Sequence, residues 1–170
     1  MRRINPVRNI RCKSRKNKIS NRVNFIKMVA SGNDFVVAET RNPKLLARQI
    51  CDRKYGVGAD GLLILDKSKV ANVKMRIFNP DGSEPAMCGN GARCIAVYSA
   101  RDQKTETRNQ IKIETKAGII ESEVDGNNVK IKFTEPKDLK LDLPIIINGI
   151  TRHVSFVNTG VPHTVIFVSG

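Results

Sequence analysis

Short apolar segments separated by turn-forming clusters run along the chain from residue 23 to residue 168, and this pattern restricts the possible folds most. Clusters rich in Gly, Asn, Asp and Pro, such as those at 31–34, 79–82 and 125–127, are typical of turns between strands. We expect strands at about 23–30, 35–40, 62–66, 73–78, 111–115, 119–124, 129–134, 145–147, 154–158 and 164–168. Apolar residues at helical spacing predict two helices, over about 43–54 and 92–100. Because most strands follow one another directly, we expect antiparallel pairing and an α+β domain.

The net charge of +14 comes largely from one end of the chain. Residues 1–22 hold nine of the 30 Lys and Arg residues and none of the 16 acidic ones, so the remainder carries a net charge of only +5. We expect residues 1–22 to be a disordered basic extension. A nucleic-acid-binding arm and a transit peptide are alternatives, but we favour an upstream extension that is not part of the functional protein.

The remaining composition argues against nucleic acid and membrane as partners. The chain has six Phe, two Tyr and no Trp, and these aromatic residues are not interleaved with the basic run, so nothing favours base stacking. No apolar run approaches the ~20 residues of a membrane-spanning helix. We therefore expect no nucleic acid and no membrane among the partners.

Four cysteines, at positions 12, 51, 88 and 94, match neither a disulfide framework nor a metal-binding pattern. The chain has no CxxC pair and no cluster of His and Cys, so we expect no metal site. A cytoplasmic location is the default for such a chain. Cys88 and Cys94 differ by about 240° around a helix at ~100° per residue, so one helix cannot direct both thiols into one site.

The segment at 56–61 reads Gly-Val-Gly-Ala-Asp-Gly and fits the GxGxxG pattern of dinucleotide-binding loops. Such a loop requires a strand before it and a helix after it, so that the pyrophosphate meets the helix N-terminus. Here the predicted helix comes first and the predicted strand follows. We therefore interpret the segment as a glycine-rich helix-to-strand connection, and we expect no cofactor.

Cys88 precedes the second predicted helix, and Gly89, Asn90 and Gly91 occupy its first turn. The free backbone N–H groups and the macrodipole at that helix end favour a thiolate over a thiol. The same N–H groups would bind a carboxylate, so a reactive thiol and an anion site would coincide there. The ordinary alternative is a small buried hydrophobic Cys88, but two glycines are unusual in a purely packing helix start. Cys12, Cys51 and Cys94 keep that ordinary interpretation.

Two amides and two histidines complete the set of polar candidates. Asn33 and Asn79 each lie where a predicted strand meets a turn, a position that asparagine occupies more often as a turn former than as a ligand contact. His153 and His163 are the only histidines, and the sequence places neither beside Cys88. A thiol can still act as a proton-transfer base by itself.

Five strings together resemble the diaminopimelate epimerase family, in the family's order and spacing. They are KMVASGNDF (27–35), DRKYGVGADGLL (52–63), RIFNPDGSEPAMCGNGARC (76–94), ETKAG (114–118) and NTGVPH (158–163). The resemblance covers about residues 23–168. It implies an α+β domain in which a strand barrel wraps around a central helix that begins near Cys88. Such a domain is one of two pseudo-symmetric halves, with the active site in the cleft between them.

The resemblance also implies a reaction and its residues. The family interconverts LL- and meso-diaminopimelate, a lysine and cell-wall precursor, without pyridoxal phosphate or metal. Two cysteines flank the α-carbon, where one removes the α-proton as a thiolate and the other delivers a proton to the opposite face. Cys88 matches the catalytic cysteine in the first half of the family's chain. The positions that match substrate-binding ones are Asn33, Asn79, Gly89, Asn90 and His163.

Two departures from the family pattern set further expectations. Val161 replaces the amide in the family's usual Gly-Asn-Pro-His string. The second half, with the second cysteine, is missing, so we expect residues 23–170 to be an N-terminal epimerase domain with negligible activity alone. The expected partners are diaminopimelate and a C-terminal domain or second chain supplying the other cysteine, and a homodimer is left open. The family start would fall at Val23, which favours residues 1–22 as a misassigned extension.

A non-catalytic half-domain that serves as a binding module is the alternative of a different class. It would share the fold and the strings, but its Cys88 would have no role in proton transfer.

Overall fold

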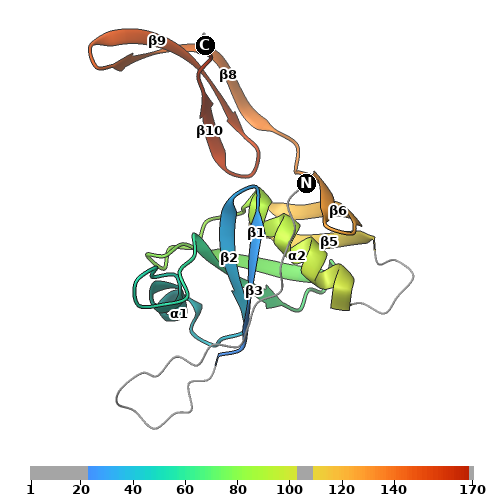
Figure 1. Ribbon diagram of the computed structural model, residues 1–170. Helices are drawn as coiled ribbons and strands as arrows, with labels where there is room; N and C mark the ends of the chain where they lie inside the picture. The colour runs from blue at the N-terminus through green and yellow to red at the C-terminus, as the bar shows by residue number, and fades with distance from the viewer. Residues whose placement is uncertain (1–22, 103–108, 169–170) are drawn as a thin grey trace.

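The computed structural model describes residues 23–102 and 109–168, and in them the chain forms a seven-stranded and a three-stranded sheet (Figure 1). The larger sheet runs in chain order through β1 (Phe25–Ala30), β2 (Asn33–Ala38), β3 (Gly61–Asp66), β4 (Val73–Phe78), β5 (Gln110–Thr115), β6 (Gly118–Asp125) and β7 (Asn128–Lys132). The smaller sheet has the order β10 (Pro162–Val165), β9 (Ile150–Asn158) and β8 (Lys137–Ile147). The two helices are α1 (Pro43–Ile50) and α2 (Gly89–Asp102). The expectations for residues 1–22, including Cys12, lie outside the described residues.

The seven-stranded sheet is a curled half-barrel around α2, which confirms the predicted α+β class and the central helix (Figure 1). Two neighbouring pairs, β2–β3 and β4–β5, are parallel, so the expectation of antiparallel pairing is wrong for them. Each of these pairs is joined by a helix, α1 or α2, and a helical crossover returns the chain in the same direction. The other pairs of both sheets are antiparallel.

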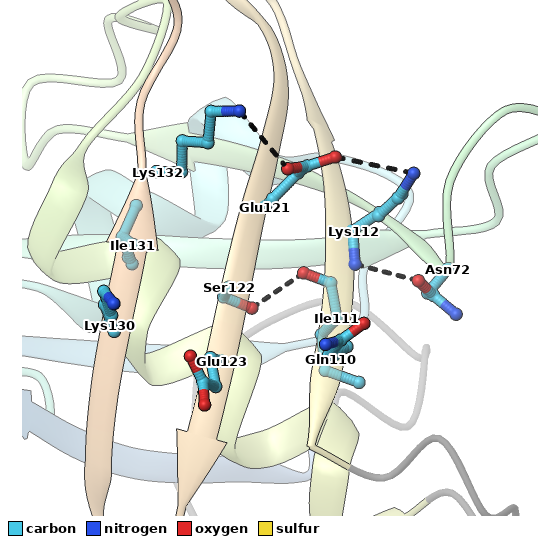
Figure 2. Close-up of a pocket in the computed structure, with 10 residues that line it drawn as sticks. All are labelled: Asn72, Gln110, Ile111, Lys112, Glu121, Ser122, Glu123, Lys130, Ile131 and Lys132. Atoms are coloured by element: carbon cyan, nitrogen blue, oxygen red, sulfur yellow. Dashed lines mark hydrogen bonds and ion pairs between the residues drawn. The ribbon is translucent and has the colours of Figure 1, made fainter.

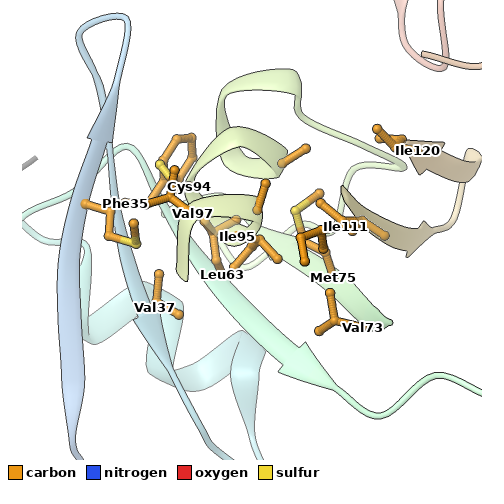
Figure 3. Close-up of a cluster of buried hydrophobic side chains, with 14 of the residues drawn as sticks. Phe35, Val37, Leu63, Val73, Met75, Cys94, Ile95, Val97, Ile111 and Ile120 are labelled. Carbon is orange, nitrogen blue, oxygen red and sulfur yellow. The ribbon is translucent and has the colours of Figure 1, made fainter. Parts of the chain in front are cut away.

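The main hydrophobic core lies between α2 and the concave face of the sheet (Figure 3). Ile95 and Val97 of α2 are almost completely buried, and they belong to the same cluster as Phe35 of β2, Leu63 of β3 and Ile111 of β5. Burying apolar area at ~25 cal/mol per Å² makes this core the main source of stability. It also fixes the position of α2, whose N-terminus carries Cys88.

A second core covers the convex face of β2, β3 and β4. Ala47 and Ile50 of α1 pack there with Val36, Leu62 and Phe78. This covering explains why β2 and β3 read as continuous apolar runs, since both of their faces are buried. In β6 buried and exposed residues alternate, because its outer face meets solvent.

The three-stranded sheet projects away from the half-barrel (Figure 1), and β8 is far longer than the predicted strand at 145–147. Asp138 and Asp142 lie inside β8 with φ of 57° and 56°, and the register with β9 shifts around them. These irregularities break the alternation of buried and exposed residues that predicts a strand, so the sequence pattern missed residues 137–144.

The helix boundaries also differ from the prediction. Helix α1 ends at Ile50 instead of residue 54, because the Asp52 carboxylate accepts the backbone N–H groups of Lys54 and Tyr55 and forms a turn there. Helix α2 begins at Gly89, three residues before the predicted start. None of the described helices is long and apolar enough to cross a membrane.

Candidate active site

Cys88 lies at the N-terminus of α2, as the sequence predicts. Its carbonyl accepts the first helical hydrogen bond, from Ala92 N–H at 2.8 Å, and its sulfur accepts the Gly91 N–H at 3.4 Å. The N–H groups of Gly89 and Asn90 precede that first bond, so no carbonyl of the preceding turn is available to them. The Cys88 side chain is half-buried, and it packs against the edge of the main core. A sulfur and two N–H groups are therefore presented together at the positive end of the helix.

Asn33 is the polar side chain that the structure places beside Cys88. It is the first residue of β2, and its Oδ1 lies 3.9 Å from the Cys88 Sγ across a separation of 55 residues. Arg93 of α2 donates to Ser31 Oγ at 2.8 Å, which ties the β1–β2 turn to the same helix. The turn and the helix N-terminus thus form one local unit.

Packing also accounts for the two glycines of the first turn, although two glycines are unusual in a helix start that serves packing only. A Cβ on Gly89 would lie 2.8 Å from the Phe133 ring, and a Cβ on Gly91 would lie 3.0 Å from Leu63 Cδ2. Phe133 therefore lies over the start of α2, and no sequence signal placed it there. The β9–β10 turn also returns to this region, since a Cβ on Gly160 would lie 3.1 Å from Met87 Cε.

A network of charged residues lies behind Asn33. Asp34 forms ion pairs with Lys27 at 2.7 Å and with Arg53 at 2.8 Å, and Arg53 also contacts Asp60 at 2.7 Å. Burial opposes the charge on Asp34, but hydrogen bonds from Arg53 and Lys27 outweigh it and hold the pKa of Asp34 well below its ordinary value. The network joins the start of β2 to the loop before β3.

The glycine-rich segment at 56–61 connects α1 to β3, in the predicted order of helix followed by strand. The local structure explains why each of these positions requires glycine. A Cβ on Gly56 would lie 2.3 Å from the Gln49 carbonyl oxygen, and Gly58 has a φ of +76°. A Cβ on Gly61 would lie 3.2 Å from the Phe78 carbonyl oxygen. Backbone geometry therefore explains the three glycines of the GxGxxG pattern. The segment also places Asp60 within the charged network.

Asn79 and His163 have no contact with Cys88 comparable to that of Asn33. Asn79 follows β4 at the end of the sheet where β3 begins, and its Nδ2 donates to Ser83 Oγ at 2.9 Å. The turn-forming interpretation therefore describes this side chain. His163 is exposed on β10, opposite Val157 of β9 in the smaller sheet.

The other described cysteines are buried in the two cores, as expected. Cys94 has 0% of its side chain exposed and Cys51 has 2%. Burial raises the pKa of Cys94 to about 12 and that of Cys51 to about 11. Of the cysteines in the described residues, only Cys88 combines access with hydrogen-bond donors.

Ion pairs of Glu84, here termed the Glu84 clamp, hold the segment before Cys88 in place. Its side chain, 11% exposed, accepts a hydrogen bond from Arg76 Nε at 2.7 Å and pairs with Lys116 at 3.0 Å. The hydrogen bond from Arg76 is the main reason that the pKa of Glu84 falls from 4.5 to about 2. The folded-state pKa lies below the unfolded one, so this clamp stabilises the fold above pH 4.5 and loses its contribution as the pH falls toward 2.

We expect Glu84→Gln to lower the free energy of unfolding at pH 7 by about 1–3 kcal/mol, the lower end reflecting solvent screening of the partly exposed cations. Urea unfolding of both proteins at several pH values measures the difference, which should shrink toward zero near pH 2 as wild-type Glu84 becomes protonated. A difference that stays constant between pH 7 and pH 2 would show that the charge of Glu84 is not what stabilises the segment.

A pocket of about 530 Å³ lies elsewhere, on the outer face of β5, β6 and β7 (Figure 2). Charged side chains line it, with Glu121 between Lys112 at 3.5 Å and Lys132 at 3.9 Å. None of the predicted site residues lines this pocket. The charges largely neutralise one another, and the pocket has no link to Cys88.

Comparison with known proteins identifies the family that most of the chain matches. The family model described as "Diaminopimelate epimerase" matches residues 25–137. The chain is 41% identical over 165 residues to diaminopimelate epimerase of Caldanaerobacter subterraneus, with 85% of this chain and 60% of the relative covered. It is 42% identical over 165 residues to that of Methanocella arvoryzae, with 86% and 59% covered. The chain therefore spans about 60% of the length of these curated relatives.

Solved structures with low sequence identity share the fold. A hydroxyproline epimerase from Agrobacterium vitis superposes with a TM-score of 0.67 at 15% identity, covering 85% of this chain and 51% of that one. A phenazine biosynthesis protein of the PhzF family from Bacillus anthracis gives a TM-score of 0.58 at 22% identity, with 85% and 54% covered. These two likenesses establish the architecture of the half-barrel around α2.

Proposed function

The chain belongs to the diaminopimelate epimerase family, and on that basis we propose that it provides one proton-transfer thiol, Cys88, of an isomerase that interconverts LL- and meso-diaminopimelate. The reaction would serve lysine and cell-wall precursor synthesis in the cytoplasm. Because the chain spans 60% of its relatives, the complete activity, its substrate and its partners belong to this proposal. The domain it provides is the half-barrel with its appended three-stranded sheet.

The observation that carries the proposal is the half-buried Cys88 sulfur, which accepts the Gly91 N–H at 3.4 Å at the start of α2. The thiolate of Cys88 is the form that would remove a proton from carbon. The N–H groups of Gly89 and Asn90 would hold the α-carboxylate of the substrate, and they would stabilise the charge that develops when the α-proton leaves. No cofactor is needed for this step.

The remaining substrate contacts follow from the matched positions. Asn33, beside the sulfur, would contact the α-amino acid end of the substrate. Asn79 and His163 would reach the substrate only if their side chains rearranged or if the assembled enzyme brought the substrate to them. The Asn79 amide is hydrogen-bonded to Ser83, and His163 is exposed on β10. Val161 provides no amide for the role that its position has in the family.

A two-thiol mechanism requires a second sulfur on the opposite face of the α-carbon. Among the described residues the other cysteines, Cys51 and Cys94, are buried, and we propose that another domain or a second chain supplies that thiol. With Cys88 alone, the described half-site can act on one face only. We therefore expect the isolated chain to convert LL- to meso-diaminopimelate at a negligible rate.

Protection of Cys88 from alkylation tests the proposal. Millimolar diaminopimelate should slow the reaction of Cys88 with iodoacetamide by about fivefold or more, because the bound carboxylate occupies the helix N-terminus. Peptide mapping by mass spectrometry reports the modified residue. The matched control is 1,5-diaminopentane, which has the same two amino groups without carboxylates and should give no protection.

An unchanged rate of Cys88 alkylation in diaminopimelate would contradict the proposed substrate site. A reactive Cys88 that no diaminopimelate protects would instead support the non-catalytic half-domain as the function of this chain.

A further inference from the structure

The glycine-rich connection at 56–61 contains Asp60, whose carboxylate contacts the Asn33 side chain at 2.8 Å. We propose that Asp60 is a positioning residue that determines which end of the Asn33 amide faces the Cys88 sulfur. The inference rests on the proposed role of Cys88 in proton transfer and deepens it. It also gives a function to the connection, which serves no nucleotide-binding purpose in the proposed reaction.

The hydrogen bonds of Asp60 determine the orientation of the amide. One carboxylate oxygen, Oδ2, accepts from Asn33 Nδ2 at 2.8 Å and from the Asp34 backbone N–H at 3.1 Å. An ionised carboxylate accepts hydrogen bonds and donates none, so the amide nitrogen of Asn33 must face Asp60. The amide oxygen must then point the other way, where it lies 3.9 Å from Cys88 Sγ.

Asp60 is itself held from several sides. Arg53 contacts its other oxygen, Oδ1, at 2.7 Å. Its backbone N–H donates to the Asp34 carbonyl at 2.9 Å, and Lys27, which pairs with Asp34, also donates to the Gly58 carbonyl. Rotation of the Asp60 side chain would break its carboxylate contacts with Arg53, Asn33 Nδ2 and the Asp34 N–H together, so the orientation of Asn33 is set firmly.

The orientation matters because the sulfur then has one acceptor and one donor beside it. The Asn33 oxygen can accept the S–H of the thiol, and the Gly91 N–H at 3.4 Å can donate to the thiolate. The first contact can be made only by the protonated sulfur, and the second suits the thiolate. Cys88 can therefore both receive a proton and return one. With the amide reversed, the sulfur would face two donors and the thiolate would be over-stabilised.

The pH profile of Cys88 alkylation reports this balance directly. The charged and titratable groups around the site are those of the network, together with Arg93 and Cys94 on α2. In Asp60→Ala the Asn33 amide can reverse and donate to the sulfur. We expect the pH of half-maximal alkylation rate to fall by about 0.5–1 unit, which is a threefold to tenfold increase in thiolate below that pH.

Two further variants separate positioning from loop stability. In Asp60→Asn the new amide keeps the size of the side chain but can either accept from or donate to Asn33, so the orientation is no longer fixed and the profile should shift in the same direction as in Asp60→Ala, by a smaller amount. In an Asn33→Ala background no amide remains to be positioned, and adding Asp60→Ala should move the profile by no more than about 0.2 pH unit. Circular dichroism confirms that each variant is folded.

An Asp60→Ala profile that matches wild type would overturn the inference, as would the same shift with and without Asn33. Either outcome concerns Asp60 only, because the profile is measured without substrate. Failure of the proposed function would appear separately, as Cys88 that diaminopimelate does not protect.

Discussion

Iodoacetamide should modify Cys88 in the folded protein at least about a hundredfold faster than Cys51 or Cys94 at pH 8. Cys94 and Cys51 are buried, with 0% and 2% exposure, and their pKa values are raised to about 12 and about 11. At pH 8 their thiolate fractions are therefore on the order of 10⁻⁴ and 10⁻³, and the reagent reaches them only through local unfolding. Cys88 is half-buried at a helix N-terminus and accepts the Gly91 N–H.

Peptide mapping after labelling for increasing times measures the rate at each cysteine. The same measurement in 8 M urea is the control, because the unfolded thiols should react at similar rates there. If Cys94 reacts as fast as Cys88 in the native protein, Cys88 is not distinguished by its position, and the proton-transfer role loses its physical basis.

The local part of the site could be predicted from the sequence. The apolar spacing after residue 91 and the glycines at 89 and 91 place Cys88 at a helix start, because capping and helix propensity act over a few neighbouring residues. The order of helix and strand around the segment at 56–61 follows from equally local patterns. The structure confirms the order of elements in both cases, although α2 begins at Gly89, three residues before the predicted start.

The contact between Asn33 and Cys88 has a different origin. These residues are 55 positions apart, and the curl of the sheet around α2 brings them together. Local sequence patterns contain no information about that curl. Only the resemblance to a family therefore predicts Asn33 as a site residue. The contacts of Asp60 with Asn33 and Asp34 are also non-local. For this reason the sequence predicts only a helix-to-strand connection for the segment at 56–61.

Three structural features could not be predicted from the sequence, for physical reasons. The parallel pairs β2–β3 and β4–β5 depend on where a helical crossover returns the chain, which strand patterns do not specify. In β8, the bulges at Asp138 and Asp142 interrupt the alternation on which strand prediction depends. Phe133 lies over the start of α2 because Gly89 leaves room for its ring, and no spacing in the sequence reveals this approach.

Replacing Cys88 by Ala should slow exchange of the substrate α-proton by about a hundredfold or more, the size of a typical general-base contribution. In the proposed step, the Cys88 thiolate takes the α-proton, and the electron pair left on the α-carbon is delocalised into the carboxylate at Gly89 and Asn90. The resulting S–H exchanges with D₂O to give S–D, and the deuteron returns to the same face. Proton removal and return by the same thiol thus predicts exchange with retention of configuration.

The matched control removes the other thiol of the same helix. Cys94→Ala deletes a buried sulfur that points into the core, so it should cost some stability and leave the exchange rate of the folded protein unchanged. If only Cys88→Ala loses exchange, the loss results from removal of the Cys88 thiol and not from a general effect on α2.

Deuterium incorporation at the α-carbon of LL-diaminopimelate in D₂O, followed by NMR with chiral analysis of the product, is the most direct measurement of the proposed chemistry. We predict that the wild-type chain and Cys94→Ala incorporate deuterium with the LL configuration retained, and that Cys88→Ala does so at least about a hundredfold more slowly. Exchange at the wild-type rate in Cys88→Ala, or no exchange in the wild-type chain, would contradict proton transfer by Cys88.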